Sequence, residues 1–190
     1  MSFYRRTVAV SDRRHWDERY AAYGPARADQ SGPPPIFRDW EDEFPTFGTA
    51  LELACGRGRG AVWLAARGMK VWAVDVSPVA IGLATGLASE TGLGDRCRFE
   101  VIDLDGGLPP GPRVDVMLCH FFRDPRLDGQ LVPRLAPGGL LAIAQLSEAD
   151  VGPGQHRSRE GELRERFAQL DVVAHREAHG EAALIARLRD

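Results

Sequence analysis

The sequence predicts an α/β fold, in which a parallel β-sheet carries helices on both faces and ends in an antiparallel hairpin. Between residues 50 and 146, apolar segments of strand length alternate with segments of helical pattern. Repeated strand–helix units of this length favour a parallel sheet. Two further strand-like segments, residues 171–175 and 182–188, are joined by a turn around residues 178–180. So short a connection requires the two strands to be antiparallel.

The core elements follow one another along the chain. We expect strands over residues 50–54, 70–76, 98–102, 114–119 and 140–146, ahead of the hairpin. We expect helices over residues 59–67, 77–91, 125–135 and 158–170. The second of these helices has the clearest start, because Ser77 suits the N-cap and Pro78 suits the first helical position.

The first 48 residues differ in character from the rest. Residues 11–23 predict a short helix, which Gly24 and Pro25 would end. A polar stretch with three consecutive prolines follows, and its composition favours a loop or lid over a core element. We therefore expect a single domain over residues 1–190, with 1–48 as N-terminal helix and lid segment and 49–190 as the core.

Composition narrows the function classes. The chain has 24 basic and 27 acidic residues, and its net charge of −3 argues against a nucleic-acid partner, which usually leaves a basic footprint. No apolar run approaches the roughly 20 residues of a membrane span. Residues 1–10 lack the apolar region of a secretory signal. We expect a cytoplasmic protein, monomer or homodimer, that acts on a small-molecule substrate and has neither a membrane nor a nucleic-acid partner.

The cysteines and histidines predict no metal site. Cys55, Cys97 and Cys119 lie far apart and show neither a disulfide framework nor paired zinc spacing. The five histidines also lack a metal-binding pattern. Reduced, mostly buried thiols are the expected state of the cysteines.

A glycine-rich loop lies between the first core strand and its helix, and residues 52–60 read Glu-Leu-Ala-Cys-Gly-Arg-Gly-Arg-Gly. Glycines let the backbone approach a ligand closely, and the helix N-terminus behind them carries partial positive charge. Asp75 ends the second strand 19 residues after Gly56. There its carboxylate can accept hydrogen bonds from both ribose hydroxyls of a nucleoside, each worth ~1.5–3 kcal/mol.

The glycines alone admit two kinds of cofactor. Gly56, Gly58 and Ala61 also fit the G-x-G-x-x-A form of a dinucleotide loop, so NAD(P) must be weighed. However, a carboxylate from Glu52 at the end of the first strand would repel a pyrophosphate and attract the amino group of a methionine moiety. The Pro-Gly-Gly turn at residues 137–139 and the terminal hairpin favour the methionine-containing cofactor as well.

Five segments resemble, in their order, the motifs of class I S-adenosylmethionine-dependent methyltransferases: ELACGRGRG, VDVS, IDLD, LAPGG and the final hairpin. The resemblance runs from about residue 50 to the C-terminus. The N-terminal HWDERYAAYG is similar to the small bacterial branch that includes tellurite-resistance and thiopurine S-methyltransferase-like enzymes. The resemblance implies a Rossmann-like, doubly wound sheet of seven strands in the order 3-2-1-4-5-7-6 with an antiparallel last strand. It also implies S-adenosylmethionine as cofactor and S-adenosylhomocysteine as product.

The resemblance further implies roles for individual residues. The cofactor would be bound by Glu52, Gly56 and Gly58 at its methionine end, Asp75 at the ribose, Val76, Asp103 and Leu104 at the adenine, Cys119 near the sulfonium, and Trp16 and Tyr20 as a cover. His120 would line the pocket near the sulfonium and is the candidate catalytic base. Phe121 and Phe122 could make cation–π contact with the sulfonium or face the substrate. Arg157 is either a solvated loop residue or a lid contact for an anionic substrate.

Each of these roles has a structural alternative. Trp16 and Tyr20, four apart on one helical face, are equally well explained by packing against each other. A free cysteine such as Cys119 is usually a packed small residue. Asp103 could cap a turn, and His120 could be a hydrogen-bonded residue of the pocket wall.

The predicted activity is methyl transfer by in-line displacement to a small-molecule acceptor. Alignment of the acceptor and exclusion of water are the main requirements. A thiol or reduced chalcogen needs no protein base at neutral pH, whereas an oxygen or nitrogen acceptor usually does. Residues 119–122, Cys-His-Phe-Phe, lack the Asn/Asp-Pro-Pro-Tyr motif of enzymes that methylate amino groups of DNA bases. Two alternatives stay open: an NAD(P)-binding oxidoreductase, and a catalytically inactive cofactor-binding regulatory module.

Overall fold

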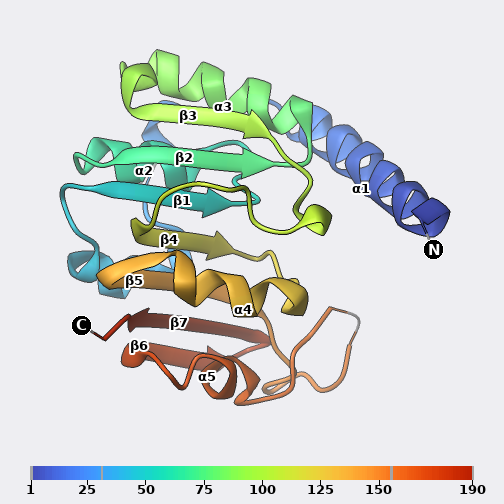
Figure 1. The fold of residues 1–190 in the computed structure, drawn as a ribbon. Helices are drawn as coiled ribbons and strands as arrows, with labels where there is room; N and C mark the ends of the chain where they lie inside the picture. Colours follow the sequence, from blue (N-terminus) through green and yellow to red (C-terminus); the bar gives the residue numbers. More distant parts are fainter. Residues whose placement is uncertain (1, 31, 155, 190) are drawn as a thin grey trace.

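The computed structural model describes residues 2–30, 32–154 and 156–189, which form a seven-stranded sheet in the order β3-β2-β1-β4-β5-β7-β6 (Figure 1). The strands are β1 Thr49–Leu53, β2 Lys70–Asp75, β3 Cys97–Val101, β4 Val114–His120, β5 Leu135–Leu146, β6 Asp171–Ala178 and β7 Glu181–Arg187. Neighbours among the first five strands are parallel, and β7 is antiparallel to both β5 and β6. The predicted Rossmann-like sheet and its strand order are confirmed.

Helices flank both faces of the sheet. The α-helices are α1 Ser2–Tyr23, α2 Arg59–Ala66, α3 Pro78–Glu90, α4 Asp128–Leu131 and α5 Glu162–Arg166. Short 3-10 segments are η1 Ala28–Gln30, η2 Pro35–Glu43, η3 Gly94–Arg96, η4 Leu104–Gly106, η5 Pro125–Leu127 and η6 Val132–Arg134. In Figure 1, α4 and α5 lie in front of the sheet, and α1 lies beside the start of α3, at the edge where β2 and β3 end.

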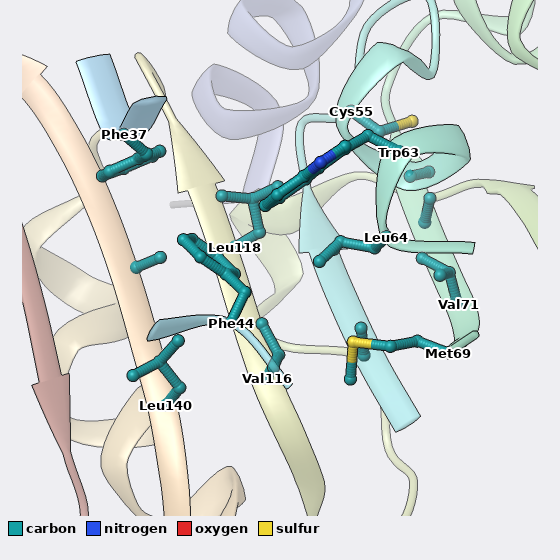
Figure 2. Close-up of a cluster of buried hydrophobic side chains, with 14 of the residues drawn as sticks. Phe37, Phe44, Cys55, Trp63, Leu64, Met69, Val71, Val116, Leu118 and Leu140 are labelled. Atoms are coloured by element: carbon teal, nitrogen blue, oxygen red, sulfur yellow. The ribbon is translucent and has the colours of Figure 1, made fainter. Parts of the chain in front are cut away.

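The hydrophobic core forms a layer on each face of the sheet. In one layer, Phe37 of η2 and Phe44, which follows η2, pack with Trp63 of α2 and Leu118 of β4 (Figure 2). Phe44 and Trp63 meet edge to face with ring centroids 4.8 Å apart. In the other layer, Phe167 packs under β4 and β5. The segment before β1 therefore contributes large side chains to the same core as the strands.

The N-terminal helix is longer than the predicted 11–23, since α1 begins at Ser2. Residues 2–23 contain neither glycine nor proline, so nothing in the sequence ends the helix before Gly24. Gly24 has a positive φ of 63° and its N–H donates to the carbonyl of Tyr20, which closes the last turn.

Two predicted core helices are much shorter than expected. The segment 125–135 is divided into η5, α4 and η6, and Pro133 near its end cannot donate a helical hydrogen bond. The segment 158–170 is helical only over Glu162–Arg166. Gly161 precedes it in the left-handed region with φ 78°, which separates residues 158–160 from the helix. The apolar side chains of that segment, Leu163 and Phe167, are buried as their spacing suggested.

The Pro-Gly-Gly segment is also placed differently. Residues 137–139 do not precede the fifth strand but lie inside β5, where Gly138 has φ 68°. The pairing of β4 with β5 shifts between Val114 and Val116, so the segment is a bulge in the strand. Residues 137–139, which the sequence predicts as a turn, are instead an irregularity within a longer strand.

Candidate functional site

A cavity of about 320 Å³ lies at the edge of the sheet where β1, β2, β3 and β4 end. Its lining comes from those strand ends and from α1: Asp12, Trp16, Arg19, Tyr20, Tyr23, Ala54, Asp75, Val76, Ile102, Asp103, Leu104, Asp105, His120, Phe121 and Phe122. Carboxyl ends of parallel strands are the usual ligand site of such sheets. The topology therefore brings most of the residues named from the sequence to one place.

A second, smaller cavity of about 130 Å³ adjoins the glycine loop. Glu52, Cys55, Arg57 and His120 are among its lining residues, and the Pro-rich stretch at residues 33–35 forms its cover. Ala54 and His120 line both cavities, so the two spaces meet at the ends of β1 and β4. A ligand longer than either cavity could occupy both.

The glycines of the loop serve two different contacts. Gly56 has φ 54°, and a Cβ there would lie 2.9 Å from the hydroxyl oxygen of Tyr20 on α1. Gly58 has φ 76°, and a Cβ there would lie 2.6 Å from the Cβ of Ala84 on α3. Gly56 therefore allows α1 to approach the loop, whereas Gly58 allows α2 and α3 to pack closely.

Glu52 is buried at the end of β1, with 5% of its surface exposed. Its carboxylate accepts the backbone N–H of Ala61, but Oε2 has no hydrogen-bond partner among the described residues. Burial, with a smaller contribution from nearby Asp75, raises the pKa of Glu52 to about 8. A buried carboxylate oxygen without a partner is costly unless a donor meets it, so this atom suits a cationic group of a ligand.

Asp75 ends β2 and is also buried. Its Oδ2 accepts the N–H of Gly56 and its Oδ1 accepts the N–H of Ser77, each at 2.9 Å. Burial raises the pKa of this carboxyl, while its backbone hydrogen bonds oppose the rise. Each carboxylate oxygen can accept further hydrogen bonds, and Asp75 lines the larger cavity.

Asp103 and Leu104 follow β3, and Val76 follows β2; all three line the larger cavity. The Asp103 side chain accepts the backbone N–H of Asp105 at 3.0 Å and caps η4. Asp103 therefore both caps a turn, which was the structural alternative for this residue, and lines the cavity. Ile102 and Asp105 were not named from the sequence, although each adjoins a named residue.

Helix α1 covers the larger cavity. Trp16 and Tyr20 stack with ring centroids 5.6 Å apart, and both line the cavity, so packing and cavity lining occur together. Burial, followed by the negative charge of Asp75, raises the pKa of the Tyr20 hydroxyl. Sequence reasoning missed three further residues of this helix, Asp12, Arg19 and Tyr23. Their spacing from Trp16 by four, three and seven residues, respectively, could have identified them.

Hydrogen bonds hold α1 against the loops that follow β1 and β2. Asp17 accepts the hydroxyl of Ser77, the N-cap of α3. Arg13 Nε donates to the carbonyl of Val76 at 3.2 Å. Arg57 of the glycine loop donates to the carbonyls of Tyr23 and Gly24 at the end of α1, at 3.4 and 3.1 Å. The cover is therefore fixed to the loops that follow β1 and β2, the strands of Glu52 and Asp75.

His120 ends β4 beside Phe121, with the two ring centroids 4.4 Å apart. Burial, and secondarily the positive charge of Arg59, lowers the pKa of His120 to about 4. The imidazole is therefore neutral at pH 7 and can accept a proton. Phe122 also lines the larger cavity.

Two side chains predicted for the site lie elsewhere, and Gly56 and Gly58 are not among the lining residues of either cavity. Cys119 is buried on the opposite face of the sheet, where its Sγ donates to the carbonyl of Phe122 at 3.2 Å. Side chains alternate along a strand, so His120 can face the cavity and Cys119 cannot. Arg157 Nη1 donates to the carbonyls of Ser147 and Gly180 at 2.6 and 2.9 Å. Arg157 therefore fastens a loop to the β6–β7 turn and does not reach either cavity.

The described residues hold neither a cluster of metal ligands nor a membrane-spanning helix. Among residues 2–30, 32–154 and 156–189, no group of three or more histidine, cysteine or acidic side chains is arranged to hold a metal ion. Within the same ranges, no helix has the length and apolar character to cross a membrane.

Comparison with known proteins gives matches over most of the chain. The family described as "Methyltransferase domain" matches residues 50–139. A 2-heptyl-1-hydroxyquinolin-4(1H)-one methyltransferase of Mycobacteroides abscessus is 32% identical over 138 residues, which are 66% of this chain. The chain spans about 60% of the length of that relative.

Solved structures share the fold at lower identity. TehB from Haemophilus influenzae superposes with a TM-score of 0.72 at 17% identity, over 82% of this chain and 62% of that one. A structure titled for the conversion of a disulfide bond into a thioacetal group during echinomycin biosynthesis gives 0.68 at 22% identity, over 93% of each chain. The matched domain and the sheet order are those of the class I S-adenosylmethionine-dependent methyltransferases, whose cofactor is S-adenosylmethionine.

Proposed function

We propose that this chain transfers a methyl group from S-adenosylmethionine to a small-molecule acceptor by in-line displacement. The observation that carries the proposal is the unpartnered Oε2 of Glu52, a buried residue that lines the smaller cavity. The amino group of the methionine moiety is a cationic donor of the kind this atom needs. A dinucleotide would instead bring a negative pyrophosphate to the same carboxylate, so the NAD(P) alternative is not favoured.

The remaining cofactor contacts follow from the residues around the cavities. Asp75 would accept the ribose hydroxyls, and Val76, Asp103 and Leu104 would meet the adenine. Arg57, which lines the smaller cavity with Glu52, would face the methionine carboxylate.

Trp16 and Tyr20 would exclude water from above the cofactor, because both line the cavity from α1. Exclusion of water favours displacement by the acceptor over hydrolysis. The hydrogen bonds that hold α1 would keep this cover closed during the reaction.

The chemistry requires little from the chain beyond alignment. Bound S-adenosylmethionine supplies a methyl group on a positively charged sulfur, which is already activated for displacement. Phe121 and Phe122 would hold the acceptor against that methyl group. The neutral His120 would take the proton of an oxygen acceptor, while a thiolate or reduced chalcogen would need no base.

The proposal also covers the chemical class of the methyl acceptor. The Mycobacteroides abscessus relative is named for a hydroxyquinolone and the echinomycin structure for a disulfide-to-thioacetal conversion. We propose an acceptor with a thiol, a chalcogen or an acidic hydroxyl, handled by a cytoplasmic monomer or homodimer. The three cysteines are free thiols, which suits a reducing compartment.

Calorimetric titration tests the cofactor first. S-adenosylhomocysteine should bind with a micromolar or lower Kd, and NADH should not bind. Binding of NADH alone would overturn the proposal. A methyl-transfer assay over thiols, phenols, selenite and tellurite then separates an enzyme from an inactive regulatory module, since the module predicts cofactor affinity without transfer to any of them.

A further inference from the structure

Phe121 has an unusual backbone for a large apolar residue. It follows the end of β4 with φ 56°, in the left-handed region that residues with a Cβ seldom adopt. Its side chain is 43% exposed and lines the larger cavity. A strained residue of this kind persists only where its surroundings impose the conformation, and such residues gather at ligand sites.

Contacts on both sides of Phe121 impose that conformation. Its N–H donates to the carbonyl of Ala144 on β5 at 2.9 Å. The carbonyl of Phe122 accepts the Sγ of Cys119, and Arg123 forms an ion pair with Glu162 of α5. The chain is thus fastened to β5 before the ring and to α5 after it, which leaves the Phe121 ring at the cavity.

The residues around the Phe121 ring indicate which kind of compound could bind there. His120 lies beside Phe121, and Phe37 also packs against His120 with ring centroids 6.3 Å apart. The imidazole therefore contacts two aromatic rings. An exposed aromatic face next to a neutral nitrogen base suits a flat ring that carries an ionisable group.

We propose that the ring face of Phe121 and the imidazole of His120 form the acceptor subsite, which takes a planar aromatic compound bearing a hydroxyl or thiol group. The inference rests on the proposed methyl transfer. A bond forms between the acceptor oxygen or sulfur and the methyl carbon, and the carbon–sulfur bond of the sulfonium breaks with its electron pair kept by sulfur. The hydroxyl proton passes to His120; an acceptor that is already a thiolate has no proton to lose.

The test measures binding to the protein saturated with S-adenosylhomocysteine, so it does not depend on turnover. Calorimetry compares two aromatic probes, 7-hydroxycoumarin and 4-hydroxyquinoline, with the aliphatic alcohol cyclohexanol. We expect at least one aromatic probe to bind more than tenfold more tightly than cyclohexanol. Phe121→Leu, which keeps an apolar side chain on the same backbone, should weaken that probe about fivefold and change S-adenosylhomocysteine affinity less than twofold.

Two variants control for general effects of the substitution. Phe47→Leu makes the same change at a phenylalanine that is 76% exposed before β1, at the opposite edge of the sheet, and should leave all affinities unchanged. Phe121→Tyr keeps the ring and should bind the aromatic probe within twofold of the wild type, which keeps the test valid if Phe121→Leu unfolds.

The outcomes separate the inference from the proposed function. Failure of S-adenosylhomocysteine to bind the wild type would overturn the proposed function itself. Normal cofactor affinity with no preference for either aromatic probe would overturn only the acceptor subsite. An aromatic probe that binds Phe121→Leu as well as wild type, or that loses as much affinity with Phe121→Tyr as with Phe121→Leu, would overturn it too.

Discussion

The two halves of the ligand edge are built in different ways. At the ends of β1 and β2, the carboxylates of Glu52 and Asp75 are held by backbone N–H groups of the glycine loop, of the first turn of α2 and of Ser77. At the end of β4, His120 and Phe121 are held by residues of η2, β5 and, through Arg123, α5. The cofactor half is thus a local construction, whereas the acceptor half is assembled from elements far apart in the sequence. A change in one half should leave the other functional.

The largest expected effect is on the cofactor half. Asp75→Ala should weaken S-adenosylhomocysteine about a hundredfold, because two hydrogen bonds to a charged acceptor, each ~1.5 kcal/mol, are lost. Calorimetry on the folded variant measures the change. Asp115→Ala is the matched control, since that carboxylate accepts the N–H of Thr49 at the opposite edge of the sheet. An unchanged affinity in Asp75→Ala would contradict the ribose assignment.

A second substitution tests whether the glycine-rich loop after β1 requires glycine at residue 58. Gly58→Ala should lower the free energy of unfolding by about 2 kcal/mol, from the left-handed backbone and the close approach of Ala84. Gly86→Ala in α3 should raise stability by about 0.5–1 kcal/mol, because no atom lies within 4 Å of its Cβ position. Thermal or urea unfolding compares the two. Equal effects would show that the loop geometry does not require glycine at residue 58.

Proton release on S-adenosylhomocysteine binding tests whether Glu52 meets the amino group of the ligand. Its pKa of about 8 means that it is largely protonated at pH 7 in the free protein, and a bound cation favours the ionised form. S-adenosylhomocysteine binding should therefore release nearly one proton at pH 7, and affinity should rise about 25-fold from pH 6.5 to 8.5 before levelling off. Calorimetry in buffers of different ionisation enthalpy measures the release. Glu52→Gln should abolish both effects; if they persist in this variant, another group titrates.

The smallest expected effect is on the acceptor half. Arg123→Gln removes the ion pair with Glu162 and should loosen the segment that carries Phe121. We expect two- to threefold weaker binding of an aromatic acceptor and no change in cofactor affinity, the size typical of a partly exposed pair. Arg159→Gln, which breaks an exposed pair with Glu165, is the control. A matching loss of cofactor affinity in Arg123→Gln would show that the two halves are coupled.

The same difference explains what the sequence could predict. Glu52 and Asp75 could be placed because their partners all lie between residues 56 and 77, and the strand order followed from the resemblance of five ordered motifs to a known family. Cys119 was misplaced because a shift of one residue along a strand reverses the face. Arg157 was misassigned because its acceptors are backbone carbonyls 10 and 23 residues away. The break at Gly161 and the bulge at residues 137–139 depend on backbone angles that residue type alone does not specify.

The left-handed backbone at residue 121 also bears on how this protein could be redesigned. Glycine, asparagine and aspartate adopt that conformation more readily than phenylalanine. Exchange of Phe121 for asparagine would therefore place an amide, with both a donor and an acceptor, at the cavity wall while relieving the backbone. The position is a natural point at which to change substrate preference without loss of the scaffold, because the residues that fix it are its neighbours and not its own side chain.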